Sequence, residues 1–306
     1  MKTAFIFPGQ GSQAIGMMSD LAASHSLVKD TFSEASDALG LDMWEMCQAG
    51  PIEALSQTEN TQPALLTCGI AAWRVWQDQG GAQPEIMAGH SLGEYTALVA
   101  ANAMSFSDGV ALVRDRGRYM QEAVPAGQGG MAAVIGLDDD KVREVCAAAA
   151  QDDVLQAVNF NAPGQVVIAG SASAIERAAV QMKEAGAKRA LPLPVSIPAH
   201  SSLMTPAAER LAERIATIEV SMPTIPVLHN CNVQIAQSDS EIAANLVSQL
   251  DSPVRWVESV NAMHAQGIER FIESGPGRVL GGMVKRIIKG VEIACIEKPD
   301  AISELL

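Results

Sequence analysis

The chain has 306 residues, of which 48% are hydrophobic, and a formal net charge of −14 at pH 7. At roughly 150 residues per domain, this length predicts one large domain or two with a sizeable core. The negative charge and the lack of a long basic run argue against a nucleic-acid-binding protein, and no apolar run approaches the ~18 residues of a membrane span.

The first predicted elements are a buried strand at Thr3–Phe7 and a glycine-rich loop after it. In this loop, Gly9-Gln10-Gly11 is not completed to a dinucleotide-binding motif, because Ala14 stands where the third glycine belongs, and the lysine of a P-loop is also missing. We interpret the loop as a source of backbone N–H groups for a neighbouring site. Several helical segments follow, the clearest over residues 62–79.

The next elements surround a G-x-S-x-G motif at Gly89–Gly93. A strand-like segment, 85–88, precedes the motif and a helix-forming segment, 94–101, follows it, which is the setting of a nucleophile elbow. The two glycines allow close backbone packing, and the helix N-terminus faces any developing oxyanion. The pattern favours Ser91 as a catalytic nucleophile over a purely structural turn.

A further helix, predicted from Phe106 to about Val124, carries an arginine in its apolar stripe. Arg116 lies between apolar positions at helical spacing, whereas Arg114 and Arg118 fall on the other side, toward solvent. An arginine is rarely buried without an anionic partner. That partner is either a core Asp or Glu, or a substrate carboxylate held by the guanidinium fork.

A change of pattern after residue 125 predicts an inserted unit with the order β-α-β-β-α-β, which is typical of a ferredoxin-like fold. Its strands are predicted at 131–135, 154–160, 165–169 and 189–193, its helices at 141–150 and 175–185, and its middle turn at 161–164. Gly127–Gly130 and Pro192–Pro194 read as bounding linkers. We therefore predict an α/β protein in which residues 1–125 and 196–306 form a large domain and residues 126–195 form the insert.

Helices and strands alternate again after the insert, with helices predicted at 206–216, 240–250, 254–266 and 279–288, and strands at 225–228, 270–273 and 292–296. The five cysteines have no metal-binding spacing, which predicts free thiols. The apolar stretch within residues 1–8 is too short for a signal peptide, so we expect a soluble cytoplasmic protein.

A serine nucleophile needs a base, and five histidines are available. His25 lies among polar residues, His90 is expected to point away from Ser91, His229 ends a strand, and His264 falls on the apolar side of its helix as a core histidine. His200 differs because it follows a strand in a loop, where functional groups are common. No carboxylate is obviously placed to orient His200, so a Ser–His pair without an acid is compatible with the pattern.

Six motifs in this order resemble the malonyl-CoA:acyl carrier protein transacylases of bacterial fatty acid synthesis over essentially the whole chain: Phe7–Gln13, Gly89–Glu94, Arg116-Gly117, Asn161–Gln165, Ser196–His200 and Glu273–Gly277. The resemblance implies a large domain related to the α/β-hydrolases with a ferredoxin-like insert. It also implies functional roles for individual residues: Ser91 as nucleophile, His200 as base, Arg116 as anchor of the malonyl carboxylate, the backbone N–H groups of Gln10 and Leu92 as oxyanion hole, and the main-chain carbonyl of Gln249 as the group that orients His200.

The resemblance further implies that malonyl-CoA and an acyl carrier protein are the partners, with no metal or redox cofactor, and we expect a monomer that binds neither nucleic acid nor membrane. An acidic carrier protein would need a local basic patch on this acidic chain. Two clusters qualify, Lys188-Arg189 and Lys285-Arg286, although either can equally be solvated surface charge. Three alternatives stay open: a serine hydrolase, a transacylase of a polyketide or malonate decarboxylase pathway, and a non-catalytic carrier-binding component.

Overall fold

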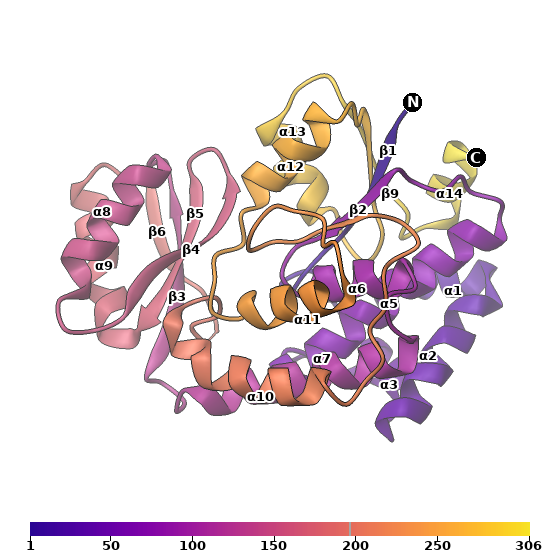
Figure 1. Cartoon of the computed structure of the whole chain (residues 1–306), viewed down its shortest axis with the longest axis horizontal. Helices are drawn as coiled ribbons and strands as arrows, with labels where there is room; N and C mark the ends of the chain where they lie inside the picture. The colour runs from indigo at the N-terminus through magenta and orange to yellow at the C-terminus, as the bar shows by residue number, and fades with distance from the viewer. Residues whose placement is uncertain (196) are drawn as a thin grey trace.

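The computed structural model describes residues 1–195 and 197–306, and over these residues the strands form two separate sheets. The first sheet is parallel, with the order β7 (Val227–Leu228), β2 (Ile86–Gly89), β1 (Thr3–Phe7), β8 (Arg270–Glu273) and β9 (Glu292–Cys295). The second is antiparallel, with the order β4 (Leu155–Ala162), β5 (Gln165–Ser171), β3 (Gly129–Ile135) and β6 (Arg189–Pro192). The protein is therefore a mixed α/β fold with two units, which lie side by side in Figure 1.

The central strand β1 is apolar on both faces because both faces are covered. Phe5 packs with its ring 4.9 Å from that of Trp73 on one side of the sheet. Ala4 and Ile6 belong to the core on the opposite side, together with Trp256. Continuous apolar sequence of this kind is typical of a strand in a parallel sheet covered by helices on both faces.

Most of the helices pack around this parallel sheet (Figure 1). They are α1 (Ser19–Ser24), α2 (Ser26–Leu39), α3 (Met43–Ala49), α4 (Ile52–Leu55), α5 (Thr58–Asp78), α6 (Leu92–Ala100), α7 (Phe106–Ala123), α10 (Thr205–Ile215), α11 (Asp239–Ser248), α12 (Trp256–Ala265), α13 (Val279–Ile287) and α14 (Pro299–Leu305), with a 3-10 turn at Ser202–Met204. Helix α5 is buried on nearly all sides and packs against both α6 and α7, so it forms the centre of the larger core.

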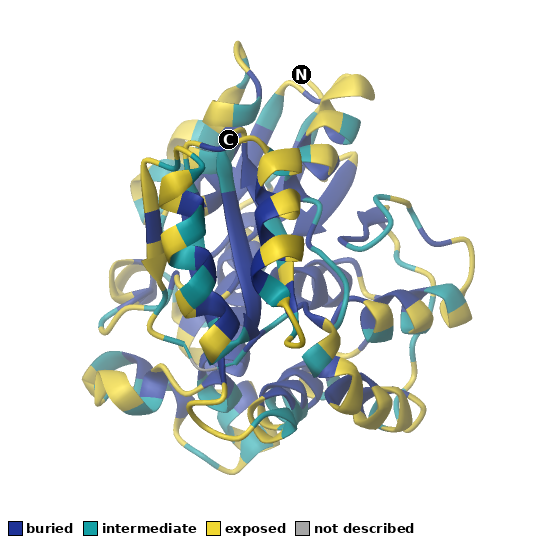
Figure 2. Cartoon of the chain, turned by 90° about the vertical axis from the view of Figure 1, so that its left-hand side faces the viewer, coloured by how far each residue is buried: buried dark blue, intermediate teal, exposed yellow. Residues whose placement is uncertain are grey.

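The antiparallel sheet has a core of its own beneath α8 (Asp139–Ala150) and α9 (Ala172–Glu184). Figure 2 views this unit from its own side and shows strands that are buried behind helices with exposed outer faces. The opposite face of the sheet is also apolar, and there Met131 and Val167 pack against Leu193, Val195 and Ala199. This contact holds the chain segment that leads to His200, the predicted base.

The structure corrects several predicted boundaries. Gly129-Gly130 and Pro192 are not linkers but strand residues, because their backbones pair across the sheet with neighbouring strands. Strand β4 extends to Ala162, which leaves only Pro163-Gly164 as the turn, and α5 starts at Thr58, four residues before the predicted start. The predicted domain boundary at Ser196 lies outside the described residues.

The structure also bears on the cysteines and on membrane-spanning helices. All five cysteines carry free thiols, as their spacing predicted. Across residues 1–195 and 197–306, no helix combines the length and the apolar character that crossing a bilayer demands.

Candidate active site

Ser91 lies at a sharp turn between β2 and α6, and its backbone has φ 52° and ψ −109°. A positive φ is costly for a residue with a side chain and is found mainly where the surrounding structure enforces it. Here Gly89 and Gly93 allow the strand, the turn and the helix to pack closely enough to hold Ser91 in this conformation. A Cβ on Gly89 would lie 1.8 Å from the carbonyl carbon of Gly93, and a Cβ on Gly93 would lie 1.9 Å from the carbonyl oxygen of Phe7. Only glycine permits this strand–turn–helix packing.

His200 is within hydrogen-bonding distance of Ser91, with 2.8 Å between its Nε2 and the Ser91 Oγ. Its other ring nitrogen, Nδ1, lies 2.7 Å from the main-chain carbonyl oxygen of Gln249. A carbonyl only accepts, so Nδ1 carries the proton and Nε2 is left free to accept from the serine hydroxyl. The backbone N–H of His200 also donates to the carbonyl of Leu250, which ties this loop to the end of α11.

The electrostatic surroundings keep His200 neutral. Its side chain is almost fully buried, and burial together with the positive charge of Arg116 lowers the pKa of the imidazole to about 3. The hydrogen bond to the Gln249 carbonyl acts in the opposite direction but is the smaller influence on this pKa. At neutral pH the imidazole is therefore in the form that can accept a proton.

Arg116, on α7, is only 1% exposed and points at the same serine. Its guanidinium donates to the Oε1 of Gln62 at 2.7 Å, to the Oε1 of Gln249 at 2.9 Å and to the Oγ of Ser91 at 3.3 Å. Among the residues that the structure describes, no carboxylate lies within ion-pair distance of it. The alternative of a core salt bridge is therefore wrong, and the cation is held by neutral amide oxygens.

Gln10 and Leu92, whose backbone N–H groups are the predicted oxyanion donors, line the same pocket as Ser91. Neither has an internal hydrogen-bond acceptor within the described part of the chain. The loop that carries Gln10 presses closely on the elbow, since a Cβ on Gly9 would lie 2.5 Å from the carbonyl oxygen of His90. Two unused donors, one at the N-terminus of α6 and one in the loop after β1, form a suitable place for a negatively charged oxygen.

The pocket lies between the two units, and its remaining wall is part polar and part apolar. Thr58 and Asn159 belong to the polar part, and the apolar part includes Met120, Met131, Leu193, Val195 and Ile197. The arrangement provides a nucleophile with a neutral base, two N–H donors, and one buried cation whose hydrogen-bond partners are uncharged. It is suited to an acyl group that carries its own carboxylate.

The other histidines are placed elsewhere. His90 lines the pocket, but its Nε2 bonds the Oδ1 of Asn161 at 2.7 Å rather than Ser91. His229 is buried against a carboxylate. The prediction of a core position for His264 is wrong: α12 buries Val260 and Met263, and the next residue is rotated by about 100° to the exposed side.

The four basic residues proposed for docking are all exposed. Arg189 pairs with Ile135 across the antiparallel sheet, Ile135 pairs with Gln165, and the side chain of Arg286 bonds the Gln165 side chain. The two clusters, which are about 100 residues apart in sequence, therefore approach the same end of this sheet. Arg286 also donates to the carbonyl of Pro163, so its guanidinium contributes to the contact between the two units.

Three polar groups of the site were not predicted: the side chains of Gln62 and Gln249 and the buried carboxylate of Glu94. Gln62 is 1% exposed in α5, but other polar residues in the same helix, such as Thr61 and Thr67, leave its sequence without a distinguishing signal. The Gln249 side chain bonds both Arg116 and Glu94, and nothing in its local sequence marks it.

Comparisons with known proteins agree with this geometry. The model of the acyl transferase domain family matches residues 4–296. The malonyl CoA-acyl carrier protein transacylase of Escherichia coli strain K12 is 54% identical over 99% of this chain and 98% of its own. The structure of an acyl carrier protein S-malonyltransferase from Vibrio cholerae is 53% identical over the whole of both chains, with a TM-score of 0.98. A malonyl-transacylase solved in complex with a type II polyketide synthase acyl carrier protein is 50% identical, with a TM-score of 0.99, over 100% of this chain and 99% of its own.

Proposed function

Because the chain belongs to the malonyl-CoA:acyl carrier protein transacylase family, we propose that it transfers a malonyl group from malonyl-CoA to the pantetheine thiol of an acyl carrier protein through an ester on Ser91. The single observation that carries the proposal is that the Ser91 Oγ lies within reach of both a neutral imidazole and an unpaired buried guanidinium. The first suits acyl transfer, and the second suits an acyl group with a terminal carboxylate.

The acylation half-reaction follows from these positions. The malonyl carboxylate pairs with Arg116, which places the thioester carbonyl at Ser91. His200 Nε2 takes the hydroxyl proton as the Oγ attacks the carbonyl carbon, and the oxyanion accepts hydrogen bonds from the N–H groups of Gln10 and Leu92. Each such donor is typically worth ~3 kcal/mol of barrier. The C–S bond then breaks, and the imidazolium returns its proton to the leaving thiolate of coenzyme A.

The second half-reaction is the reverse in form. The pantetheine thiol gives its proton to His200 and its sulfur attacks the carbonyl carbon of the malonyl-serine ester, while the same N–H groups hold the oxyanion. The C–O bond to Ser91 then breaks, and the imidazolium returns the proton to the Ser91 Oγ. The two substrates use one site in turn, which predicts ping-pong kinetics. The Gln249 carbonyl would hold the imidazolium in place in both halves.

Residues 126–195 fit a ferredoxin-like insert in a large domain related to the α/β-hydrolases. The support is the element order βαββαβ with purely antiparallel pairing and the strand order β4-β5-β3-β6 in the small unit, and an elbow after a strand of the parallel sheet in the large one. We further infer a monomer in the cytoplasm, where free thiols persist.

The carrier protein has two candidate sources. The family's role in fatty acid synthesis favours the carrier of that pathway. A relative at 50% identity bound to a type II polyketide carrier favours the second candidate, a polyketide acyl carrier protein. Steady-state kinetics with purified carriers from both pathways would separate them by kcat/KM.

An intact-mass measurement tests the proposed function. Mixing the protein with malonyl-CoA should add one malonyl group, and holo acyl carrier protein should then remove it and gain the same mass. A serine hydrolase would release malonate to water without carrier, and a non-catalytic carrier-binding component would show no adduct. Acetyl-CoA, run in parallel, should acylate Ser91 far more slowly, because it lacks the carboxylate that Arg116 would bind.

A further inference from the structure

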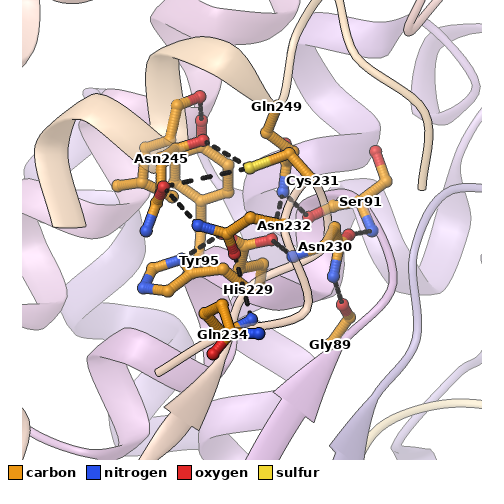
Figure 3. Close-up of polar contacts among 12 residues, drawn as sticks. Gly89, Ser91, Tyr95, His229, Asn230, Cys231, Asn232, Gln234, Asn245 and Gln249 are labelled. Atoms are coloured by element: carbon orange, nitrogen blue, oxygen red, sulfur yellow. Dashed lines mark hydrogen bonds and ion pairs between the residues drawn. The ribbon is translucent and has the colours of Figure 1, made fainter. Parts of the chain in front are cut away.

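The backbone of the nucleophile is held by two amide side chains. The Ser91 N–H donates to the Oδ1 of Asn230 at 2.7 Å, and the Ser91 carbonyl accepts from the Nε2 of Gln249 at 2.9 Å. Figure 3 shows Asn230 and Gln249 approaching Ser91 from different segments of the chain. Because Ser91 has an unfavourable positive φ, these two contacts oppose relaxation of the turn.

Asn230 spans the turn itself. Its Nδ2 donates to the carbonyl of Gly89 at 2.7 Å, while its Oδ1 accepts from Ser91 two residues later. A single, fully buried side chain therefore fixes the backbone on both sides of residue 90. Asparagine fits this position because its amide offers one acceptor and two donors on neighbouring atoms.

A buried carboxylate in turn holds the backbone of Asn230 and the side-chain amide of Gln249. Glu94 lies on α6, three residues after Ser91, and is 0% exposed. Its oxygens accept from the Nδ1 of His229 at 2.7 Å, the backbone N–H of Asn230 at 2.9 Å and the Nε2 of Gln249 at 2.9 Å. These contacts form a closed ring. Glu94, on the helix that begins at the elbow, binds the loop after β7 through His229 and Asn230, and the Asn230 side chain binds the elbow backbone.

The ring also fixes the direction of the Gln249 amide. A carboxylate only accepts hydrogen bonds and a guanidinium only donates them. The Gln249 Nε2 must therefore face Glu94 and the Oε1 must face Arg116, at 2.9 Å each. One donor of this amide is thereby directed at Glu94 and the other is available for the Ser91 carbonyl.

We propose that Asn230 is a positioning residue for the nucleophile, which acts by clamping the Gly89–Ser91 backbone so that the Ser91 Oγ stays at hydrogen-bonding distance from His200, with Glu94 as the buried anchor of the clamp. The inference rests on the proposed function, because it assigns Ser91 as the acylated residue. Asn230 holds no part of the substrate. Its loss should therefore slow attack on any acyl group and leave the choice between acyl groups unchanged.

The test is Asn230→Leu, which keeps the approximate shape of the side chain and removes both hydrogen bonds. The rate of Ser91 acylation at saturating thioester, followed by intact mass, should fall at least tenfold with malonyl-CoA and with acetyl-CoA alike. KM should change less than threefold, and the malonyl-to-acetyl ratio should stay within twofold of that of the native chain. If the leucine variant does not fold, Asn230→Ala removes the same two bonds without new bulk, and the same outcome is expected.

Asn245→Leu is the matched control. Asn245 is a largely buried amide in the same polar cluster (Figure 3), and its Oδ1 accepts from Asn232 but makes no contact with Ser91. It should lower the melting temperature with little effect on the acylation rate of the folded protein.

Three results would overturn the inference: acylation by folded Asn230 variants within twofold of the native rate, an equal loss in Asn245→Leu, or a loss confined to malonyl-CoA. Failure of the proposed function has a different signature, since the native chain itself would then acquire no acyl group from either thioester.

Discussion

Replacing Arg116 by methionine should convert a malonyl-selective site into one that favours a neutral acyl group. Methionine fills much of the volume that arginine leaves but offers no donor. The guanidinium is 1% exposed and is held by Gln62 and Gln249 through uncharged oxygens, so its charge is free for a ligand. A malonyl carboxylate in the variant would have no cation to pair with, in a pocket that Met120 and Met131 also line.

The size of the effect follows from the burial. Removing one partner of a buried charge pair typically costs about 3–5 kcal/mol, which corresponds to a loss of roughly 10²- to 10³-fold or more in kcat/KM for malonyl-CoA. Acetyl-CoA has no carboxylate to lose, so its transfer should hold or rise. Arg116→Lys should also lose malonyl transfer, because an ammonium cannot form the two-pronged contact with a carboxylate.

The assay is the initial rate of acylation with each thioester, followed by intact mass, with melting temperatures to establish that the variants are folded. The pH profile gives a second readout. Arg116 is the second cause, after burial, of the low pKa of His200, so the acid limb for acetyl transfer should move to higher pH in Arg116→Met. Equal losses with both thioesters would refute the reasoning and make Arg116 a structural residue.

Four further outcomes are expected. Ser91→Ala should keep its fold and acquire no malonyl group by intact mass; a stable adduct would place the nucleophile elsewhere. His200→Ala should lower the acylation rate by roughly 10² or more, as loss of a general base does, and near-normal turnover would assign the base to another residue. Charge reversal at Lys285 or Lys188 should raise KM for the carrier protein at low salt but not for malonyl-CoA, and unchanged carrier kinetics would remove these residues from the docking surface. Burial raises the pKa of Glu273 to about 7, above its unfolded value, so its favourable contribution to stability is lost as the pH rises from about 4.5 through 7. The melting temperature of Glu273→Gln, relative to that of the native chain, should therefore increase between pH 5 and pH 8. A difference in melting temperature that stays constant over this range would contradict the prediction.

The elements with strong periodicity were the ones that the sequence predicted well. β1 was predicted at its observed bounds, and α7 within a residue of its end, because a buried strand and an amphipathic helix each carry a repeating apolar signal. Helices α3 and α4 have only seven and four residues, too few for a period to be recognised. The glycines at 129–130 were misread because cross-strand pairing, and not local preference, makes them part of β3.

The candidate site likewise has residues that local sequence predicted and contacts that it did not. The elbow and the buried arginine are marked by local sequence, because a turn between glycines and a charge in an apolar stripe are visible without a fold. The contacts around Glu94 are not, since it meets His229 at a separation of 135 residues and Gln249 at 155. Such pairings depend on how the strands and helices pack in the folded protein, so the sequence of a single segment does not predict them.

The joint position of Arg116 and His200 links substrate choice to catalysis. Burial and the Arg116 charge together lower the pKa of His200 to about 3, which leaves the imidazole neutral but weakly basic. A carboxylate paired with Arg116 offsets the second of these causes, so the arrival of a malonyl group raises the basicity of the residue that must deprotonate Ser91. An acetyl group brings no such charge. Under the proposed function, the guanidinium would therefore discriminate between acyl groups twice, once by binding the carboxylate and once by lowering the basicity of His200 until that carboxylate is present.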